Sequence, residues 1–247
     1  MGAMSFLEHL DELRKRIVNS AIAVGIGVIA AFAFHQRVYD FVFEPTRRVL
    51  PDGTRLMYTE PGEAFSLHIQ IALIAGVVVA APFIMYQVWR FIAPGLYANE
   101  KKFAVPFVLF STIGFILGAL FNHYVAFPFM MTFFASFNAE DLVFMPKIGP
   151  VFSLYAKFLI ALGLIFQMPT VVFFLAKMKL VTARFLAKNF KYAVLIIFIL
   201  AAVITPSGDP GTQAVFAAPM IGLYLISIVI AWIVGPKRLK ASDQKND

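Results

Sequence analysis

Apolar residues fill six long stretches of the chain, and charged residues gather between them. A helix needs about 20 consecutive apolar residues to cross a bilayer, because it rises only about 1.5 Å per residue. The six stretches are residues 17–34, 65–91, 103–127, 151–176, 192–204 and 214–234. The pattern therefore predicts an all-α, polytopic membrane protein with six spans in a single membrane domain, residues 1–247.

Two of these stretches differ from an ordinary span. The fifth is short, because its thirteen residues rise only ~20 Å against a hydrocarbon core of ~30 Å. The third runs on without a full charge from Phe103 to Phe137, too long for one span and too short for two. We expect Pro128 to bend the chain, so that "FPFMMTFFASF" lies along the outer surface of the bilayer as an interfacial segment.

Charge placement indicates the orientation. An even number of spans puts both termini on one side, and fifteen of the 21 Lys and Arg residues lie on that side. Five lie on the other side, and Lys157 falls within the fourth span. The positive-inside rule then places both termini in the cytoplasm, with residues 236–247 as a cytoplasmic tail.

Composition narrows the class of protein further. The chain is 60% hydrophobic and 14% charged, with a formal net charge of +7 and no cysteine. We reject nucleic acid as a partner, because the basic residues flank apolar runs instead of forming one stripe. Disulfides and thiolate metal sites are excluded. We interpret residues 1–3, which precede a second Met, as a cloning remnant.

Small residues mark faces where helices can approach closely. Ala72, Gly76 and Ala80 recur at four-residue spacing, and Gly114 and Gly118 form a second pair. Such faces serve helix packing within the bundle more often than dimerisation.

No enzyme or cofactor signature is present. The sequence has neither H-E-x-x-H nor a phosphate-binding G-x-x-x-x-G-K-[ST], and its four histidines are scattered over different segments. The rival class is a six-helix secondary transporter for a small solute, which should have interrupted helices and an ionisable group at mid-membrane. Lys157 is the candidate group. We expect its amine to extend along the helix to the nearer interface.

Four strings, taken together, resemble one family. They are "HLDELRKR", "YQVWRFIAPGLYANEKK", "FQMP" and "TPSGDPGTQ", in order along nearly the whole chain. The chain resembles TatC, the multi-spanning core of the twin-arginine protein translocase. The resemblance implies a cup-shaped bundle with short fifth and sixth helices, in the bacterial inner membrane. It also implies binding of twin-arginine signal peptides of folded cargo, single-span TatA- and TatB-type partners, an oligomeric assembly and export driven by the proton-motive force.

The resemblance also implies a signal-peptide site. Glu12 and Glu100 match positions that the family uses to bind the arginine pair, and Arg14 matches a further position of the signal region. Carboxylates suit this role, because each can accept a guanidinium in a bidentate fork. The alternatives remain open. Glu12 lies at i,i+4 spacing from Arg16, Glu100 can stabilise a helix N-terminus, and Arg14 can anchor to lipid.

A second implied site would dock the partner helices. Thr205 and Gln213 flank the turn between the last two spans, where polar groups at membrane depth are often functional. Asp209 belongs to the same turn, although it can equally cap it. Gln167 stands where many family members carry glutamate, so a role that depends on charge is in doubt there.

Overall fold

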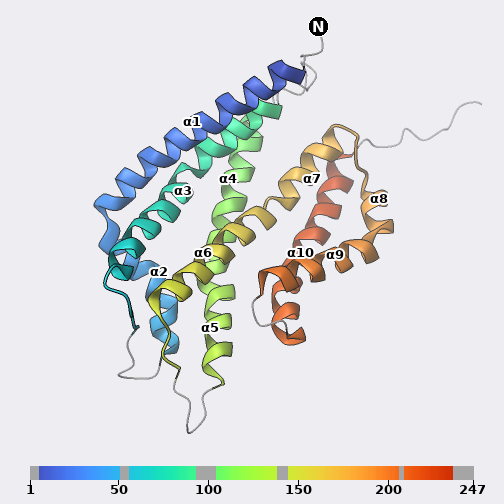
Figure 1. Cartoon of the computed structure of the whole chain (residues 1–247). Helices are drawn as coiled ribbons and strands as arrows, with labels where there is room; N and C mark the ends of the chain where they lie inside the picture. The colour runs from blue at the N-terminus through green and yellow to red at the C-terminus, as the bar shows by residue number, and fades with distance from the viewer. Residues whose placement is uncertain (1–5, 51–55, 93–103, 138–143, 206–208, 236–247) are drawn as a thin grey trace, which may run out of the picture. The chain divides into compact units, whose positions relative to one another are not determined.

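The computed structural model describes residues 6–50, 56–92, 104–137, 144–205 and 209–235. The chain divides into two compact units, residues 1–166 and 167–247, which are described separately. Apart from one isolated bridge between Met57 and Lys147, the described residues are helical or irregular (Figure 1). The all-α prediction is confirmed, whereas the single membrane domain stays a prediction.

The first unit holds most of the helices. They are α1 (Phe6–Ala33), α2 (His35–Val49), α3 (Glu63–Ile92), α4 (Ala104–Phe121), the π-helical turn η3 (Asn122–Ala126), α5 (Phe127–Ala135) and α6 (Ile148–Ile165). Small residues set the contact between α1 and α3, as the sequence predicts for the Gly76 face. A Cβ added to Gly27 would lie 2.7 Å from the carbonyl oxygen of Gly76, and one added to Gly76 would lie 2.7 Å from the amide nitrogen of Val28. The backbones of α1 and α3 therefore touch directly.

The connection between the first two spans is folded. Helix α2 buries Val42 and Phe43 on one face, while Arg47 bonds Asp40 on the exposed face at 3.0 Å. After residues 51–55, Met57 pairs with the start of α6 through backbone hydrogen bonds to Pro146 and from Ile148. The carboxylate of Glu63 then accepts hydrogen bonds from the amides of Thr59 at 2.9 Å and Gly149 at 3.2 Å. Glu63 thus fastens this connection to α6.

The third span corrects the prediction made for Pro128. The chain remains helical from Ala104 to Ala135, through η3 and into α5, with no separate interfacial segment (Figure 1). Proline has no N–H to donate and crowds the preceding turn. The chain widens into a π turn just before Pro128, where the amide of Phe127 bonds the carbonyl of Asn122, five residues earlier. Proline is thus accommodated by a local change of pitch, and the predicted break is wrong.

The second unit carries the last helices. They are α7 (Met168–Lys177), α8 (Ala183–Lys188), α9 (Phe190–Ile204) and α10 (Pro210–Val234). Helix α7 continues the fourth span after a short interruption at Phe166 and Gln167, next to Pro169. Helix α10 packs against α7 and α9, and the hydroxyl of Tyr224 donates to the carbonyl of Leu186 in α8 at 3.0 Å.

Within the described residues, five helical runs are long and apolar enough to cross a membrane, and α9 is a shorter apolar helix. Its 15 residues rise about 22 Å, so the short fifth span is confirmed. Helix α10 has 25 residues and rises about 37 Å, so the expectation of a short sixth helix is wrong. The helix gains length because it begins at Pro210, four residues before the apolar run that the sequence indicates.

Candidate functional site

Glu12 is held in a chain of contacts between α1 and α3. The Nε atom of Arg16 donates to Oε1 of Glu12 at 2.7 Å, and a terminal nitrogen of the same guanidinium bonds the same oxygen. The other terminal nitrogen donates to the side-chain oxygen of Gln87 in α3 at 3.1 Å. Arg16 is 8% exposed and Gln87 is 4% exposed. The pair is therefore more than a surface ion pair, because it also ties the two helices together.

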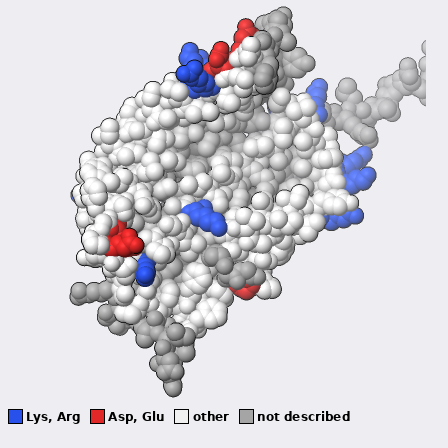
Figure 2. Space-filling model, in the orientation of Figure 1, with Lys and Arg blue, Asp and Glu red and all other residues white. Residues whose placement is uncertain are grey.

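The neighbouring charges of α1 differ from Glu12 in their burial. Glu8, Asp11, Arg14 and Lys15 are exposed, whereas the side chain of Glu12 is 20% exposed. Among the described residues, no ion pair joins Asp11 to Lys15 despite their i,i+4 spacing. Figure 2 shows acidic and basic side chains together at this end of α1, beside a largely uncharged surface. Glu12 is thus the acid of this segment that a buried neighbour holds in place.

Glu100 lies outside the described residues, in the connection 93–103. The helices on either side of this connection make aromatic contacts near their ends. Trp89 near the end of α3 packs against Phe107 of α4, with ring centroids 5.2 Å apart. Phe91 stacks on His9 of α1 at 4.5 Å. Helix α3 therefore ends beside the segment of α1 that carries Glu12.

The predicted docking residues of the second unit lie on either side of residues 206–208, which are outside the described part of the chain. Thr205 ends α9, is buried, and donates its hydroxyl to the carbonyl of Ala201 at 2.8 Å. Asp209 caps α10 by accepting from the amide and the hydroxyl of Thr212, at 2.8 and 2.6 Å. The capping role for Asp209 is confirmed. Gln213 lies one turn into α10 and is half-buried.

Helix α9 buries a narrow stripe and exposes most of its surface. Ile197, Ala201 and Ile204 are buried at three- and four-residue spacing. The exposed large aliphatic and Phe side chains are Leu195, Ile196, Phe198, Ile199, Leu200 and Val203. We define the α9 edge as this exposed face together with Thr205 and Gln213. The edge is apolar, with polar groups at one end.

Two further residues that the sequence analysis singled out lie in the fourth span. Gln167 is half-buried and precedes α7, at the interruption next to Pro169. Lys157 is exposed and lies nine residues after Ile148, about 14 Å along α6. The side chain of a helical lysine points toward the helix N-terminus, so the ammonium lies closer to the start of α6 than its Cα does.

The first unit contains a buried polar cluster that the sequence did not predict. His123 of η3 is 2% exposed, and its Nδ1 lies 3.1 Å from the hydroxyl of Tyr155 in α6. Its ring stacks on Phe41 of α2 at 3.9 Å, and its Nε2 lies 3.5 Å from a carboxylate oxygen of Glu44. The cluster joins three elements that are remote in sequence. The available signal was a histidine within the run from Phe103 to Phe137 that carries no full charge, and this signal did not indicate a partner.

The described residues hold no group of three or more His, Asp or Glu side chains that could bind a metal ion.

Comparison with known proteins identifies the family. Residues 8–219 match the family Sec-independent protein translocase protein (TatC). The Sec-independent protein translocase protein TatC of Koribacter versatilis (strain Ellin345) is 40% identical over 96% of this chain and 88% of its own length. That of Helicobacter pylori (strain J99 / ATCC 700824) is 37% identical over 97% of this chain and 94% of its own length. Two crystal structures of the twin-arginine translocase receptor TatC, one of them in DDM, are 36% identical and cover 91% of this chain. The matched regions make up 98% and 99% of the two solved chains, and the TM-scores are 0.77 and 0.78. The chain therefore belongs to the TatC family, the receptor and core subunit of the twin-arginine translocase.

Proposed function

We propose that this translocase subunit binds the arginine pair of twin-arginine signal peptides through Glu12 of α1 and Glu100 of the connection 93–103. The observation that carries the proposal is that the half-buried carboxylate of Glu12 already holds one guanidinium, that of Arg16. Arg16 occupies one oxygen of this carboxylate, and the other oxygen can accept a hydrogen bond from a second guanidinium. Membership of a translocase family argues against both an enzyme and the small-solute transporter.

The contacts of Glu12 refine how a signal arginine would bind. Oε1 accepts both hydrogen bonds from Arg16, and no described residue bonds Oε2. Arg16 is buried and also bonded to Gln87, so displacing it would leave a buried charge without its partner, which is costly. A signal arginine would therefore bind Oε2 and leave Arg16 in place. We propose the bidentate fork for Glu100, as the sequence led us to expect. Arg14 would lie at the exposed rim.

The test of this function is binding of a signal peptide to the purified chain. A synthetic peptide with an Arg-Arg pair should co-purify with the detergent-solubilised protein, and the matched Lys-Lys peptide should do so poorly. Lysine provides a point charge, whereas guanidinium fits a carboxylate with two donors. Equal recovery of the two peptides would refute arginine recognition.

The orientation that this function needs is itself a prediction. Both termini should face the cytoplasm of a bacterial inner membrane, because fifteen of the 21 basic residues lie on that side. A cysteine at Asp243 should be protected from an impermeant thiol reagent in intact cells, whereas one at Asp52 should react. Labelling of the cysteine at position 243 alone would reverse the orientation and remove the signal site from the cytoplasm.

We further propose that the α9 edge docks single-span partners of the TatA and TatB type and nucleates their oligomeric assembly. Helix α9 rises about 22 Å, less than the ~30 Å hydrocarbon core, and its exposed face is apolar. A partner helix would cover this face and share the polar groups of Thr205 and Gln213 at its end. Gln167 and Asp209 are expected to contribute less, since Asp209 already caps α10.

Photocrosslinking amino acids tests this edge. Incorporated at Gln213, which is half-buried, and at Val203, which is 67% exposed, they should capture a single-span partner. The matched position on the buried stripe, Ile197, should not. If Gln213 and Val203 capture lipid alone, and the double replacement Thr205→Val and Gln213→Leu leaves export intact, the docking surface lies elsewhere.

A further inference from the structure

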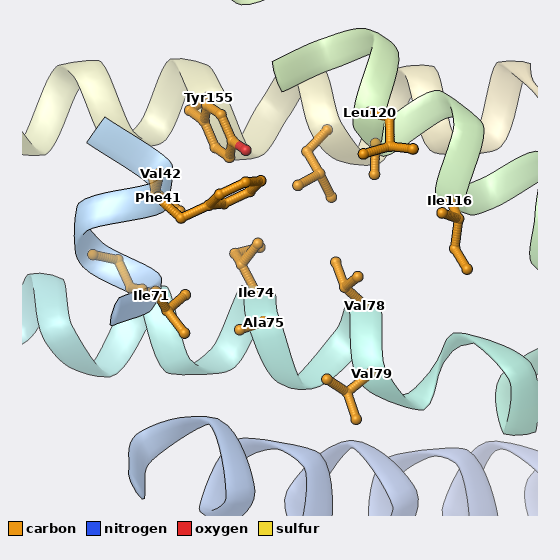
Figure 3. A pocket seen from close by; sticks show the side chains of 13 residues that line it. Phe41, Val42, Ile71, Ile74, Ala75, Val78, Val79, Ile116, Leu120 and Tyr155 are labelled. Atoms are coloured by element: carbon orange, nitrogen blue, oxygen red, sulfur yellow. The ribbon is translucent and has the colours of Figure 1, made fainter. Parts of the chain in front are cut away.

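An apolar pocket of about 250 Å³ opens in the first unit between α2, α3, α4 and α6 (Figure 3). Thirteen side chains line it, among them Phe41, Ala75, Val79, Ala119 and Tyr155. Twelve of the thirteen are hydrocarbon throughout, and the hydroxyl of Tyr155 is within hydrogen-bonding distance of His123. The pocket therefore selects an apolar occupant, because its walls provide no other polar group.

The pocket lies along the middle of the spans and opens to their surface. Its residues in α3 run from Ile71 to Val79, about 12 to 24 Å from the first residue of a helix about 45 Å long. Large side chains at its edge are exposed, including Val79 at 63% and Phe41 at 48%. In a membrane this opening faces hydrocarbon. Water does not fill such a cavity, because it finds no hydrogen-bonding partners there.

The shape of the pocket favours a narrow hydrocarbon occupant. A helix with its side chains is about 10 Å across, which is wide for a pocket enclosed by four helices. A single extended hydrocarbon chain is narrower and can fill the space between the four walls. Filling it restores the dispersion contacts that the lining side chains otherwise lack.

A cation stands beside the pocket on α2. Arg37 precedes Phe41 by one turn, so the two lie on the same face of the helix. The other arginines of α2 are paired, Arg47 with Asp40 and Arg48 with Glu44, whereas Arg37 makes no ion pair with any described residue. An exposed guanidinium at the end of an apolar pocket provides a binding group for a phosphate.

We propose that this pocket binds one acyl chain of an anionic phospholipid from the leaflet on the α2 side, with the lipid phosphate at Arg37. The lipid would fill the space between α2 and the three spans that pack around it. This site is separate from Glu12 and from the α9 edge, so it stands independently of signal binding.

The test uses the full chain in nanodiscs with a phosphatidylglycerol that carries a diazirine within its acyl chain. Photolabelling should map to the pocket segments, around residues 71–79 and 155–159. Excess unlabelled phosphatidylglycerol should abolish this labelling, and the same excess of phosphatidylcholine should not. Arg37→Gln should remove the difference between the two competitors. Labelling that both competitors reduce equally in the wild-type protein would overturn the proposal.

Variants that fill the pocket provide a second measurement. Ala75→Phe and Ala119→Phe should each reduce labelling of the pocket segments to background and leave signal-peptide binding intact. Ala23→Phe is the matched control, because Ala23 lines a different groove between α1 and α3. Unchanged labelling in a folded pocket variant would contradict the proposal. So would cross-links from the pocket to a second copy of the chain or to a partner protein.

Discussion

Gly27→Ala should lower the free energy of unfolding of the first unit by about 1–3 kcal/mol, the typical cost of overfilling a packed contact. The added methyl would lie 2.7 Å from the carbonyl oxygen of Gly76 and 3.1 Å from its Cα. Both neighbours are backbone, which cannot rotate away as a side chain can. Helices α1 and α3 would have to separate, and the hydrogen bond from Arg16 to Gln87 would lengthen with them.

Gly25 provides the matched control on the same helix. A Cβ added there meets nothing within 4 Å, so Gly25→Ala should be neutral or stabilising by roughly 0.5–1 kcal/mol through helix propensity. Unfolding of the purified variants in mixed micelles, titrated with SDS, gives the comparison. If Gly27→Ala is as stable as Gly25→Ala, the close approach of the two backbones is wrong.

Glu12→Gln should weaken binding of an Arg-Arg signal peptide about tenfold or more. Loss of a charge-assisted hydrogen bond costs on the order of 1.5–3 kcal/mol, and 1.4 kcal/mol is a factor of ten in affinity. The amide keeps an oxygen that can still accept from Arg16, so the tie to α3 should survive. Glu100→Gln should have an effect of similar size.

The other acids of α1 are the controls for this prediction. Glu8→Gln and Asp11→Asn remove one exposed negative charge each, a few residues from Glu12. They should change affinity much less, because exposed charges are screened and hydrated. The amount of each variant in the membrane should match the wild-type protein. A loss of binding shared by all four variants would indicate a general effect of negative charge.

The spans were predictable because hydrophobic length is a local property. Counting apolar residues placed all six runs, including the short α9, and charge spacing brought Glu12 and Arg16 onto one turn. Other features depended on how the backbone adapts. Pro128 did not end its helix, because the preceding π turn changes the backbone hydrogen-bonding pattern and accommodates a residue without an N–H. Helix α10 began earlier than its apolar run, because Asp209 and Pro210 form a helix start.

The partners of the site residues were beyond the reach of sequence spacing. Gln87 is 71 positions from Arg16, and nothing in "YQVWR" indicates which side of α3 meets α1. The same holds for His123, whose contacts Phe41, Glu44 and Tyr155 come from two other helices. Long-range pairs of this kind follow from the crossing of helices, which depends on small residues such as Gly27 and Gly76.

The measurement that tests the central claim most directly is the affinity of Arg-Arg and Lys-Lys signal peptides for three proteins: wild type, Glu12→Gln and Gln87→Leu. The wild-type protein should prefer the Arg-Arg peptide, and Glu12→Gln should lose most of that preference. Gln87→Leu breaks the tie between α1 and α3 without touching the carboxylate, so it should lower stability and keep the preference. If Glu12→Gln weakens both peptides equally and Gln87→Leu does the same, then Glu12 supports the helix pair and does not read arginine.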